Sequence, residues 1–298
     1  MKTPRSIFGI LMAYAQLTRA SNLPTIFSNV LMGSAVAAGQ APLPWRRVLI
    51  AVAALSALYA AAMATNDAID AQADRLTRPG RPIPSGRIGR RHAWVLSAVA
   101  AAMALWMLAW TTLLAAGMGI ALTASALGYN VAHKKCPKSV VLMGVCRGLV
   151  YVTAAAAVAT EPTPIPWTTL LGLATVLALY TTILAWIART EKRPQIGGRR
   201  WWSVAMPAVA LGAAAWVRPG CLVWAVGVGL VMVVWLARGV RFVFRDPPQT
   251  SQAVMVGLSG MCLVDAYGLT LLDRPLLAVT ALACFAVTVW AHRQVAGT

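Results

Sequence analysis

Residues 66–86 read NDAIDAQADRLTRPGRPIPSG, and this stretch directly follows a long apolar segment. It contains three of the eight acidic residues of the chain, Asp67, Asp70 and Asp74. At about 100° per residue, these positions and Asn66 share one face of a helix. Carboxylates on one face repel each other unless a cation lies among them, and such oxygen clusters suit Mg²⁺ shared with a substrate phosphate. The stretch therefore predicts a magnesium site, and the neighbouring apolar residues and arginines disfavour the alternative of a solvated acidic helix end.

Long apolar segments make up most of the chain. Of its 298 residues, 59% are hydrophobic and 11% are charged, a composition that excludes a soluble protein. Apolar segments of about 17–22 residues are long enough to cross a bilayer as helices. We recognise ten of them, at 22–40, 46–65, 92–111, 114–130, 139–159, 167–188, 201–217, 220–237, 252–271 and 276–292. Because the connections are short, we expect one integral membrane domain over residues 1–298.

The net charge of +18 is distributed unevenly between the loops. With alternate loops assigned to two sides of a membrane, 21 of the 26 basic residues fall on one side. The other side holds Arg46, Arg47, Arg218 and Arg274, and Arg147 lies within an apolar segment. We interpret this bias as marking the cytoplasmic side, and we expect both termini and the 66–86 stretch there, in a bacterial plasma (inner) membrane. We therefore expect the basic loops to face anionic lipid, and we expect no nucleic acid partner.

The stretch 66–86 resembles the first aspartate-rich motif of the UbiA superfamily of intramembrane prenyltransferases. That motif reads approximately N-D-x-x-D-x-x-x-D with a trailing R-P-x-R-P-x-x-x-G, which residues 78–86 match closely. The resemblance implies an all-α, polytopic membrane bundle of nine to ten transmembrane helices. It also implies Mg²⁺-dependent transfer of a prenyl group from a prenyl diphosphate to an aromatic or other small lipophilic acceptor within the membrane.

The resemblance further assigns roles to individual residues. Asp67, Asp70 and Asp74 are the expected catalytic and metal-binding residues. The side chains expected to bind the substrate diphosphate are Asn66, Arg81, Arg19, Asn22, Tyr129, Lys134 and Arg147.

Two charged residues lie inside apolar segments. Arg147 is about 14 Å into its segment at 1.5 Å per residue, and an intramembrane arginine should face a cavity or a partner. A cation lining the diphosphate pocket and a structural pair both remain open for this residue. For Asp265 we expect a structural polar contact, with Arg274 or with nearby Asn or Tyr groups, rather than an ion site.

The loop after segment 167–188 departs from the family pattern. The family has a second aspartate-rich motif there, whereas residues 188–198 read ARTEKRPQIGG and contain one acidic residue, Glu191. Glu191 is the expected remaining metal ligand of this motif, and residues 188–191 resemble the EboC-like branch of the superfamily. A catalytically reduced homologue is one alternative. A membrane transporter or scaffold for an isoprenoid-linked metabolite is another, although it gives no reason for three grouped carboxylates.

Overall fold

The chain folds into helices throughout the part that its computed structural model describes, residues 7–159, 164–191, 197–217 and 220–294. No strand occurs within these ranges, so the all-α prediction is confirmed. The α-helices in chain order are α1 Ile7–Leu17, α2 Leu23–Ala38, α3 Trp45–Thr77, α4 Arg90–Ala109, α5 Leu113–Ala132, α6 Val140–Val158, α7 Trp167–Ala188, α8 Trp201–Leu211, α9 Leu222–Val243, α10 Thr250–Leu271 and α11 Pro275–Gln294.

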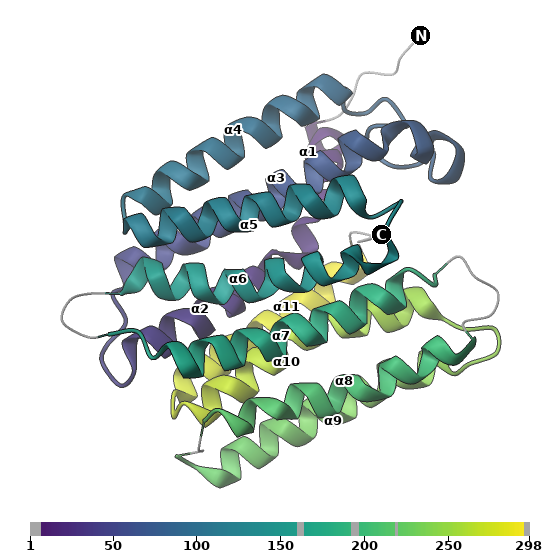
Figure 1. Cartoon of the computed structure of the whole chain (residues 1–298). Helices are drawn as coiled ribbons and strands as arrows, with labels where there is room; N and C mark the ends of the chain where they lie inside the picture. The colour runs from purple at the N-terminus through teal and green to yellow at the C-terminus, as the bar shows by residue number, and fades with distance from the viewer. Residues whose placement is uncertain (1–6, 160–163, 192–196, 218–219, 295–298) are drawn as a thin grey trace.

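Each of the ten predicted apolar segments coincides with one of these helices. Eight helices of the described chain, α3 to α7 and α9 to α11, are long and apolar enough to cross a membrane. The segments 22–40 and 201–217 form shorter helices, α2 with 16 residues and α8 with 11 residues. Figure 1 shows α8 running alongside α9. The polytopic bundle is thus confirmed, with two of its ten expected spans shorter than the others.

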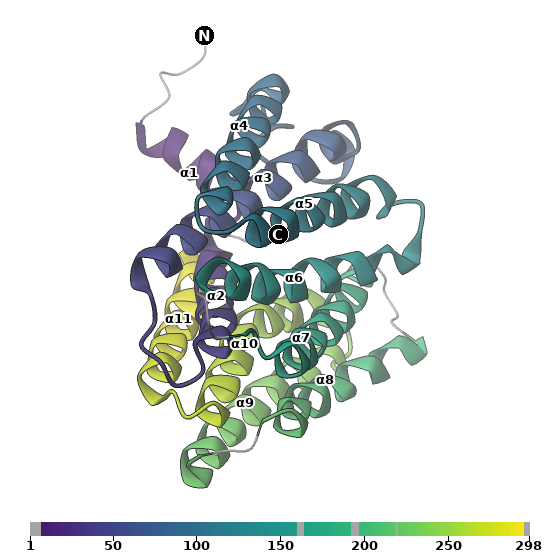
Figure 2. The ribbon, with the colours of Figure 1, turned by 60° about the vertical axis from the view of Figure 1, so that its left-hand side comes forward.

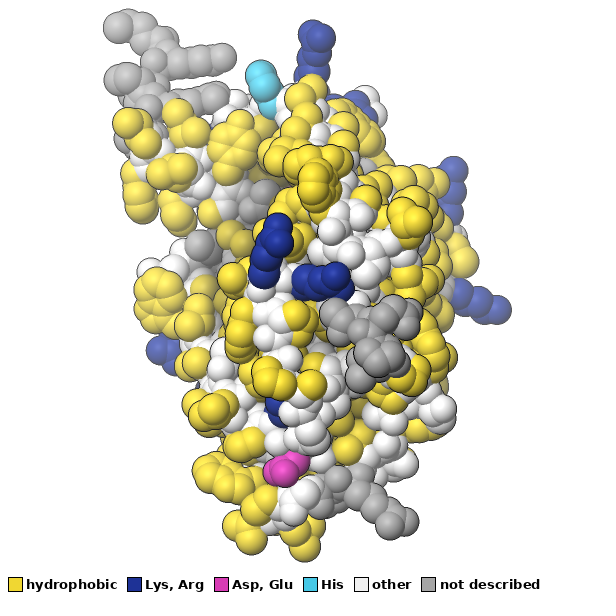
Figure 3. Space-filling view, turned by 90° about the vertical axis from the view of Figure 1, so that its left-hand side faces the viewer, with side chains coloured by type: hydrophobic (Ala, Val, Ile, Leu, Met, Phe, Trp, Pro, Cys, Tyr) yellow, Lys and Arg dark blue, Asp and Glu magenta, His cyan; other side chains and the backbone are white. Residues whose placement is uncertain are grey.

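From α2 to α11 successive helices run in opposite directions, so their connections alternate between two ends of the bundle (Figure 1). The start of α1, the end of α11 and the loop 78–89 lie at the same end. Figure 3 views the opposite end, where hydrophobic and uncharged side chains predominate over a few basic groups. This arrangement agrees with the alternation used to divide the basic residues. Of those residues, Lys2, Arg5, Lys192, Arg193 and Arg218 lie outside the described ranges.

The interior of the bundle is built around α2 and α10. Every residue of α10 from Ser259 to Leu271 is buried, and α2 is buried from Ser28 to Ala37. Figure 2 shows α2 between α6 and α11. Helices that are enclosed on all sides need small residues where they cross, because backbones must approach closely. Gly33 of α2 meets this requirement, since its backbone lies directly against that of Tyr151 in α6.

Helix α3 contains the first part of the 66–86 stretch, up to Thr77. Its 33 residues give it a length of about 50 Å, which exceeds the roughly 30 Å hydrocarbon core of a bilayer. The last turns of α3, which carry Asp67, Asp70 and Asp74, therefore extend toward the membrane surface. The helix ends at Thr77, where the proline- and glycine-containing loop begins.

The N-terminal helix α1 was not among the predicted helices. Its buried residues Ala13 and Leu17 join a small apolar cluster with Ala64, Ala68 and Ala71 of α3. The opposite face of α1 exposes large apolar side chains, namely Ile7, Phe8, Ile10 and Leu11. A short helix of this kind suits the boundary between lipid and water. It packs behind the acidic end of α3 and supports it.

The close crossing of α2 and α6 gives a stability prediction. A Cβ added to Gly33 would lie 2.3 Å from the carbonyl oxygen of Tyr151, a backbone atom that cannot move aside. Gly33→Ala should therefore destabilise the protein by about 1–3 kcal/mol, as overpacking does. The matched control is Gly117→Ala in α5, where no described atom outside the backbone of the same helix lies within 4 Å of the new Cβ. Thermal unfolding in detergent checks this: equal melting temperatures for the two variants would contradict the tight crossing.

Candidate active site

A cavity of about 650 Å³ lies between α2, α3, α5, α6, α7 and α10. Its walls gather residues that are far apart in the sequence. All predicted site residues except Asp67 line it: Arg19, Asn22, Asn66, Asp70, Asp74, Arg81, Tyr129, Lys134, Arg147 and Glu191. The sequence therefore predicted most of the polar lining of this cavity.

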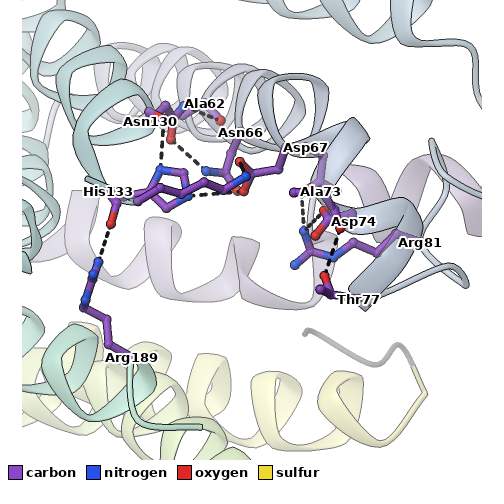
Figure 4. Close-up of polar contacts among 12 residues, drawn as sticks. Ala62, Asn66, Asp67, Ala73, Asp74, Thr77, Arg81, Asn130, His133 and Arg189 are labelled. Carbon is purple, nitrogen blue, oxygen red and sulfur yellow. Dashed lines mark hydrogen bonds and ion pairs between the residues drawn. The ribbon is translucent and has the colours of Figure 1, made fainter. Parts of the chain in front are cut away.

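Arginine side chains accompany two of the three aspartates at the end of α3, Asp67 and Asp74. The Nη1 atom of Arg81 lies 2.6 Å from Asp74 Oδ2 and 3.3 Å from Asp67 Oδ1 (Figure 4). The Nη2 atom of Arg19 lies 3.7 Å from Asp67 Oδ1. Arg81 lies in the loop directly after α3, so it is close in sequence to the carboxylates that it neutralises. Asp67 lies behind this guanidinium rather than on the cavity wall.

Asp70 has its own pair of basic partners, both from the end of α5. Lys134 Nζ lies 2.5 Å from Asp70 Oδ1, and His133 Nε2 lies 3.2 Å from Asp70 Oδ2. His133 Nδ1 lies 2.9 Å from the carbonyl oxygen of Asn130, so both ring nitrogens face acceptors. Both nitrogens donate only when the ring is protonated. The hydrogen bond to the Asp70 carboxylate accordingly raises the pKa of His133.

Sequence reasoning missed His133 and Asn130 as site residues. Asn66 Nδ2 donates to Asn130 Oδ1 at 3.1 Å, and Asn130 Nδ2 donates to the carbonyl of Ala62 at 3.1 Å (Figure 4). These two bonds fix the amide of Asn66 at the start of the acidic stripe. Arg189 Nη1 donates to the carbonyl oxygen of His133 at 2.5 Å, and so links the end of α7 to the end of α5.

Glu191 lies across the cavity mouth from the aspartates. Its Oε2 atom is 3.5 Å from Arg78 Nη2, and Ser251 Oγ donates to its Oε1 atom. Arg78 belongs to the arginine-proline loop after α3, so this ion pair links the loop of the first motif to the position of the second. The neighbouring Lys192 and Arg193 lie outside the described residues.

The donor set fits a hard cation such as Mg²⁺, which prefers carboxylate and phosphate oxygens. In this structure the carboxylate oxygens of the aspartates are paired with basic side chains. Among the described residues, no three His, Cys, Asp or Glu side chains come together at metal-binding distance. Arginine and lysine side chains are long enough to turn from the carboxylates toward phosphate oxygens. The site is thus suited to a metal that is bound together with an anionic substrate.

Arg147 lies deeper in the cavity than the aspartates. Its guanidinium carbon is 5.5 Å from the ring centre of Tyr59, and Nη1 donates to Asn29 Oδ1 at 3.1 Å. Tyr59 precedes Asn66 by seven residues in α3, which corresponds to about 10 Å along the helix.

Asp265 is a buried structural contact, as expected, and its partners are now defined. It accepts hydrogen bonds from Ser28, from Asn29 at 2.8 Å and from Tyr151. Arg274 is instead bonded to the carbonyl groups of Gly39 and Ala41 at the far end of the bundle.

The fold and the site define a polytopic membrane protein with an acidic stripe and basic side chains at the mouth of a largely apolar cavity. Residues 26–261 match the UbiA prenyltransferase family, and the chain belongs to that family.

Similar proteins agree with this assignment. Over 85 residues the chain is 39% identical to a digeranylgeranylglyceryl phosphate synthase of Ignicoccus hospitalis. The match covers 28% of this chain and 27% of that protein, so it spans about a quarter of either length.

Two solved structures share the fold. The apo structure of a UbiA homologue from Aeropyrum pernix has a TM-score of 0.63 and 19% identity, and the match covers 84% of this chain and 96% of that one. A UbiA homologue from Archaeoglobus fulgidus, bound to DMAPP and Mg²⁺, has a TM-score of 0.58 and 14% identity, with coverage of 92% and 99%. The UbiA-like fold predicted from the sequence is therefore confirmed.

The contacts of Arg81 lead to a prediction on stability. Its side chain is 10% exposed, and Arg81→Met would leave Asp67 and Asp74 buried beside each other with less positive charge. Removing one partner of a buried pair costs about 3 kcal/mol, so the melting temperature should fall clearly. Added Mg²⁺ should restore part of the loss, because the ion replaces the missing charge.

Arg91→Met is the matched control, since Arg91 is exposed at the start of α4. It should melt close to the unchanged protein, with or without Mg²⁺. If the Arg81 variant behaves like the Arg91 variant, Arg81 does not neutralise the stripe.

Proposed function

We propose that the protein transfers a prenyl group from a prenyl diphosphate to a small lipophilic acceptor within the membrane, with Mg²⁺ as cofactor. The observation that carries this proposal is the acidic stripe of α3, with basic side chains around it, at the mouth of a cavity with apolar walls. Membership of the UbiA prenyltransferase family supports it, as does the similarity to a homologue bound to DMAPP and Mg²⁺.

The polar mouth of the cavity would hold the diphosphate. Asp67, Asp70 and Asp74 would hold Mg²⁺, which when bound neutralises phosphate oxygens and so helps the leaving group depart. Arg81, Arg19 and Lys134 would turn from the carboxylates and donate charge-assisted hydrogen bonds to phosphate. The side chains of Asn66, Asn22 and Tyr129 would complete the polar wall.

The deeper part of the cavity would hold the hydrocarbon chain. Its apolar lining comes from six helices and includes Ile26, Leu55, Leu58, Leu122, Val150, Leu184 and Met261. As the bond between C1 and the diphosphate breaks, an allylic cation forms that water would destroy. A dry apolar wall prevents that reaction, and the faces of Tyr59 and Tyr129 can stabilise the positive charge.

Glu191 would contribute the remaining acidic group of the second motif. It is already paired with Arg78, so it offers a single carboxylate that a cation shares. We therefore propose one strongly held Mg²⁺ at the aspartates, with arginines supplying the rest of the positive charge around the diphosphate.

The cavity mouth would face the cytoplasm of a bacterial plasma membrane. The mouth lies at the end of the bundle that holds the loop 78–89, and most of the basic residues belong to the loops of this end. The positive-inside rule assigns such loops to the cytoplasm.

Substitutions of single carboxylates test the proposed diphosphate and metal site. Asp70→Asn removes one negative charge and should lower Mg²⁺-dependent binding of geranyl diphosphate and its transfer at least 100-fold. Glu191→Gln should lower transfer by about tenfold or less, because one metal remains. Titration calorimetry and a product assay measure both quantities.

Asp273→Asn serves as the control, since Asp273 is exposed at the opposite end of the bundle. It should bind and react like the unchanged protein. Full Mg²⁺-dependent binding in the Asp70 variant would refute the site. Tight binding without any transfer, to any acceptor, would instead favour a catalytically reduced homologue.

The orientation is tested by cysteine labelling in intact cells. Single cysteines placed at Ser85 in the loop after α3 and at Gln40 in the loop after α2 should lie on opposite sides. An impermeant maleimide should label the Gln40 position from outside and should leave the Ser85 position unlabelled until the cells are opened. The reverse pattern would contradict a cytoplasmic active site.

A further inference from the structure

A second polar layer lies beneath the acidic stripe, and the proposed diphosphate site does not account for it. Its centre is Arg147 of α6, whose guanidinium stacks on Tyr59 and donates to Asn29. Asn29 Nδ2 in turn donates to Asp265 at 2.8 Å. The side chain of Asn29 thus bridges the arginine and a carboxylate that is fully buried.

The carboxylate of Asp265 is occupied by neutral donors. Ser28, Asn29 and Tyr151 all donate to it, and among the described residues no ion pair joins it directly to Arg147. A purely structural arginine in a membrane interior would pair directly with such a carboxylate. Here the carboxylate of Asp265 balances the charge of Arg147 without touching it. Most N–H donors of the guanidinium therefore have no hydrogen-bond partner among the described residues.

The unused donors face the cavity. Among the described residues, Asn29 is the hydrogen-bond partner found for Arg147, and Arg147 lines the cavity wall. None of its nitrogen atoms is both fully enclosed and without a partner in the described chain. The remaining N–H groups therefore point into the space where a ligand would lie. A guanidinium offers a planar fork of donors that matches a carboxylate or a phosphate.

The depth of Arg147 separates it from the diphosphate. Tyr59, on which it stacks, precedes Asp70 by eleven residues, or about 16 Å along α3. Asn29 follows Asn22 by seven residues, or about 10 Å along α2. The positions that carry the two partners of Arg147 thus lie well below the acidic stripe, and the Tyr59 hydroxyl, which accepts from Asn22 Nδ2 at 3.1 Å, links the two layers. A diphosphate held by Asp70 places its C1 atom between the two layers, which is where an acceptor must present its nucleophile.

We propose that Arg147 binds an anionic oxygen group, a carboxylate or a phosphate, on the acceptor substrate, and that Asp265 acts through Asn29 as the residue that positions it. This inference rests on the proposed prenyl transfer and specifies the acceptor for it. The acceptor enters with its charged group toward Arg147 and its nucleophilic atom toward the diphosphate. Aromatic carboxylates and lipid phosphates share this chemistry.

Matched pairs of probes test the proposal by calorimetry on the full-length protein, with Mg²⁺ and geranyl S-thiolodiphosphate present. One pair is 4-hydroxybenzoate and its uncharged amide; the other is an alkylglyceryl phosphate and the alkylglycerol. One charged probe should bind at least tenfold more tightly than its neutral partner. Arg147→Gln should weaken that probe by about 10- to 100-fold, the value of a charge-assisted bond, and should leave the neutral partner unchanged.

Further variants separate positioning from folding. Arg147→Lys keeps the charge without the fork and should fall between Arg147→Gln and the unchanged protein. Asp265→Asn should weaken the charged probe alone, whereas a loss of folding would weaken every ligand. Ser34→Ala is the control, because Ser34 is buried on the same helix as Asn29 and its hydroxyl has no partner among the described residues. It should bind all probes normally.

Two results would overturn the proposal. One is that neither charged probe binds the unchanged protein more tightly than its neutral partner. The other is that Arg147→Gln weakens geranyl S-thiolodiphosphate as strongly as Asp70→Asn does, which would return Arg147 to the diphosphate site. A failure of the proposed function itself looks different: the thiolodiphosphate would not bind with Mg²⁺ at all, while the charged probe would still depend on Arg147.

Discussion

Three carboxylates buried on one stripe of a helix stay ionised only if positive charge lies beside them, and this constraint organises the site. Arg81 and Arg19 supply this positive charge at Asp67, and Arg81 also supplies it at Asp74. At Asp70 it comes from Lys134 and His133. The loop after α3, the turn before α2 and the end of α5 therefore converge on the same helix. The same cations are suited to receive a diphosphate when Mg²⁺ takes their place.

Local patterns in the sequence predicted a large part of this arrangement. The spacing of the aspartates predicted the acidic stripe, and the loop that follows them predicted that Arg81 lies near it. The apolar segments predicted the ten helices that traverse the bundle. Helix α1 has 11 residues, too few to stand out as a membrane-spanning segment by hydropathy alone. Asn130 and His133 reach the stripe because α5 packs beside α3, and neither residue belongs to a local pattern that shows this.

The polar layer around Arg147 and Asp265 could be predicted even less from local patterns in the sequence. The sequence marked Arg147 and Asp265 as costly intramembrane charges, but they are 118 positions apart and lie on different helices. Asn29, which joins them, is an unremarkable polar residue of an apolar segment. Only the packing of α2 between α6 and α10 brings the three together. The cavity consequently has two charged levels, one at its mouth and one within, with apolar walls around the space between them.

Diffraction at the manganese edge, from crystals grown with Mn²⁺ and geranyl S-thiolodiphosphate, tests the central claim most directly. We expect a strong anomalous peak within bonding distance of carboxylate oxygens from the Asp67, Asp70 and Asp74 stripe and of a phosphate oxygen. We also expect Arg81 and Lys134 to have turned from the carboxylates toward the diphosphate. A diphosphate bound elsewhere, or a stripe that keeps its arginine and lysine pairs with no metal peak, would contradict this claim.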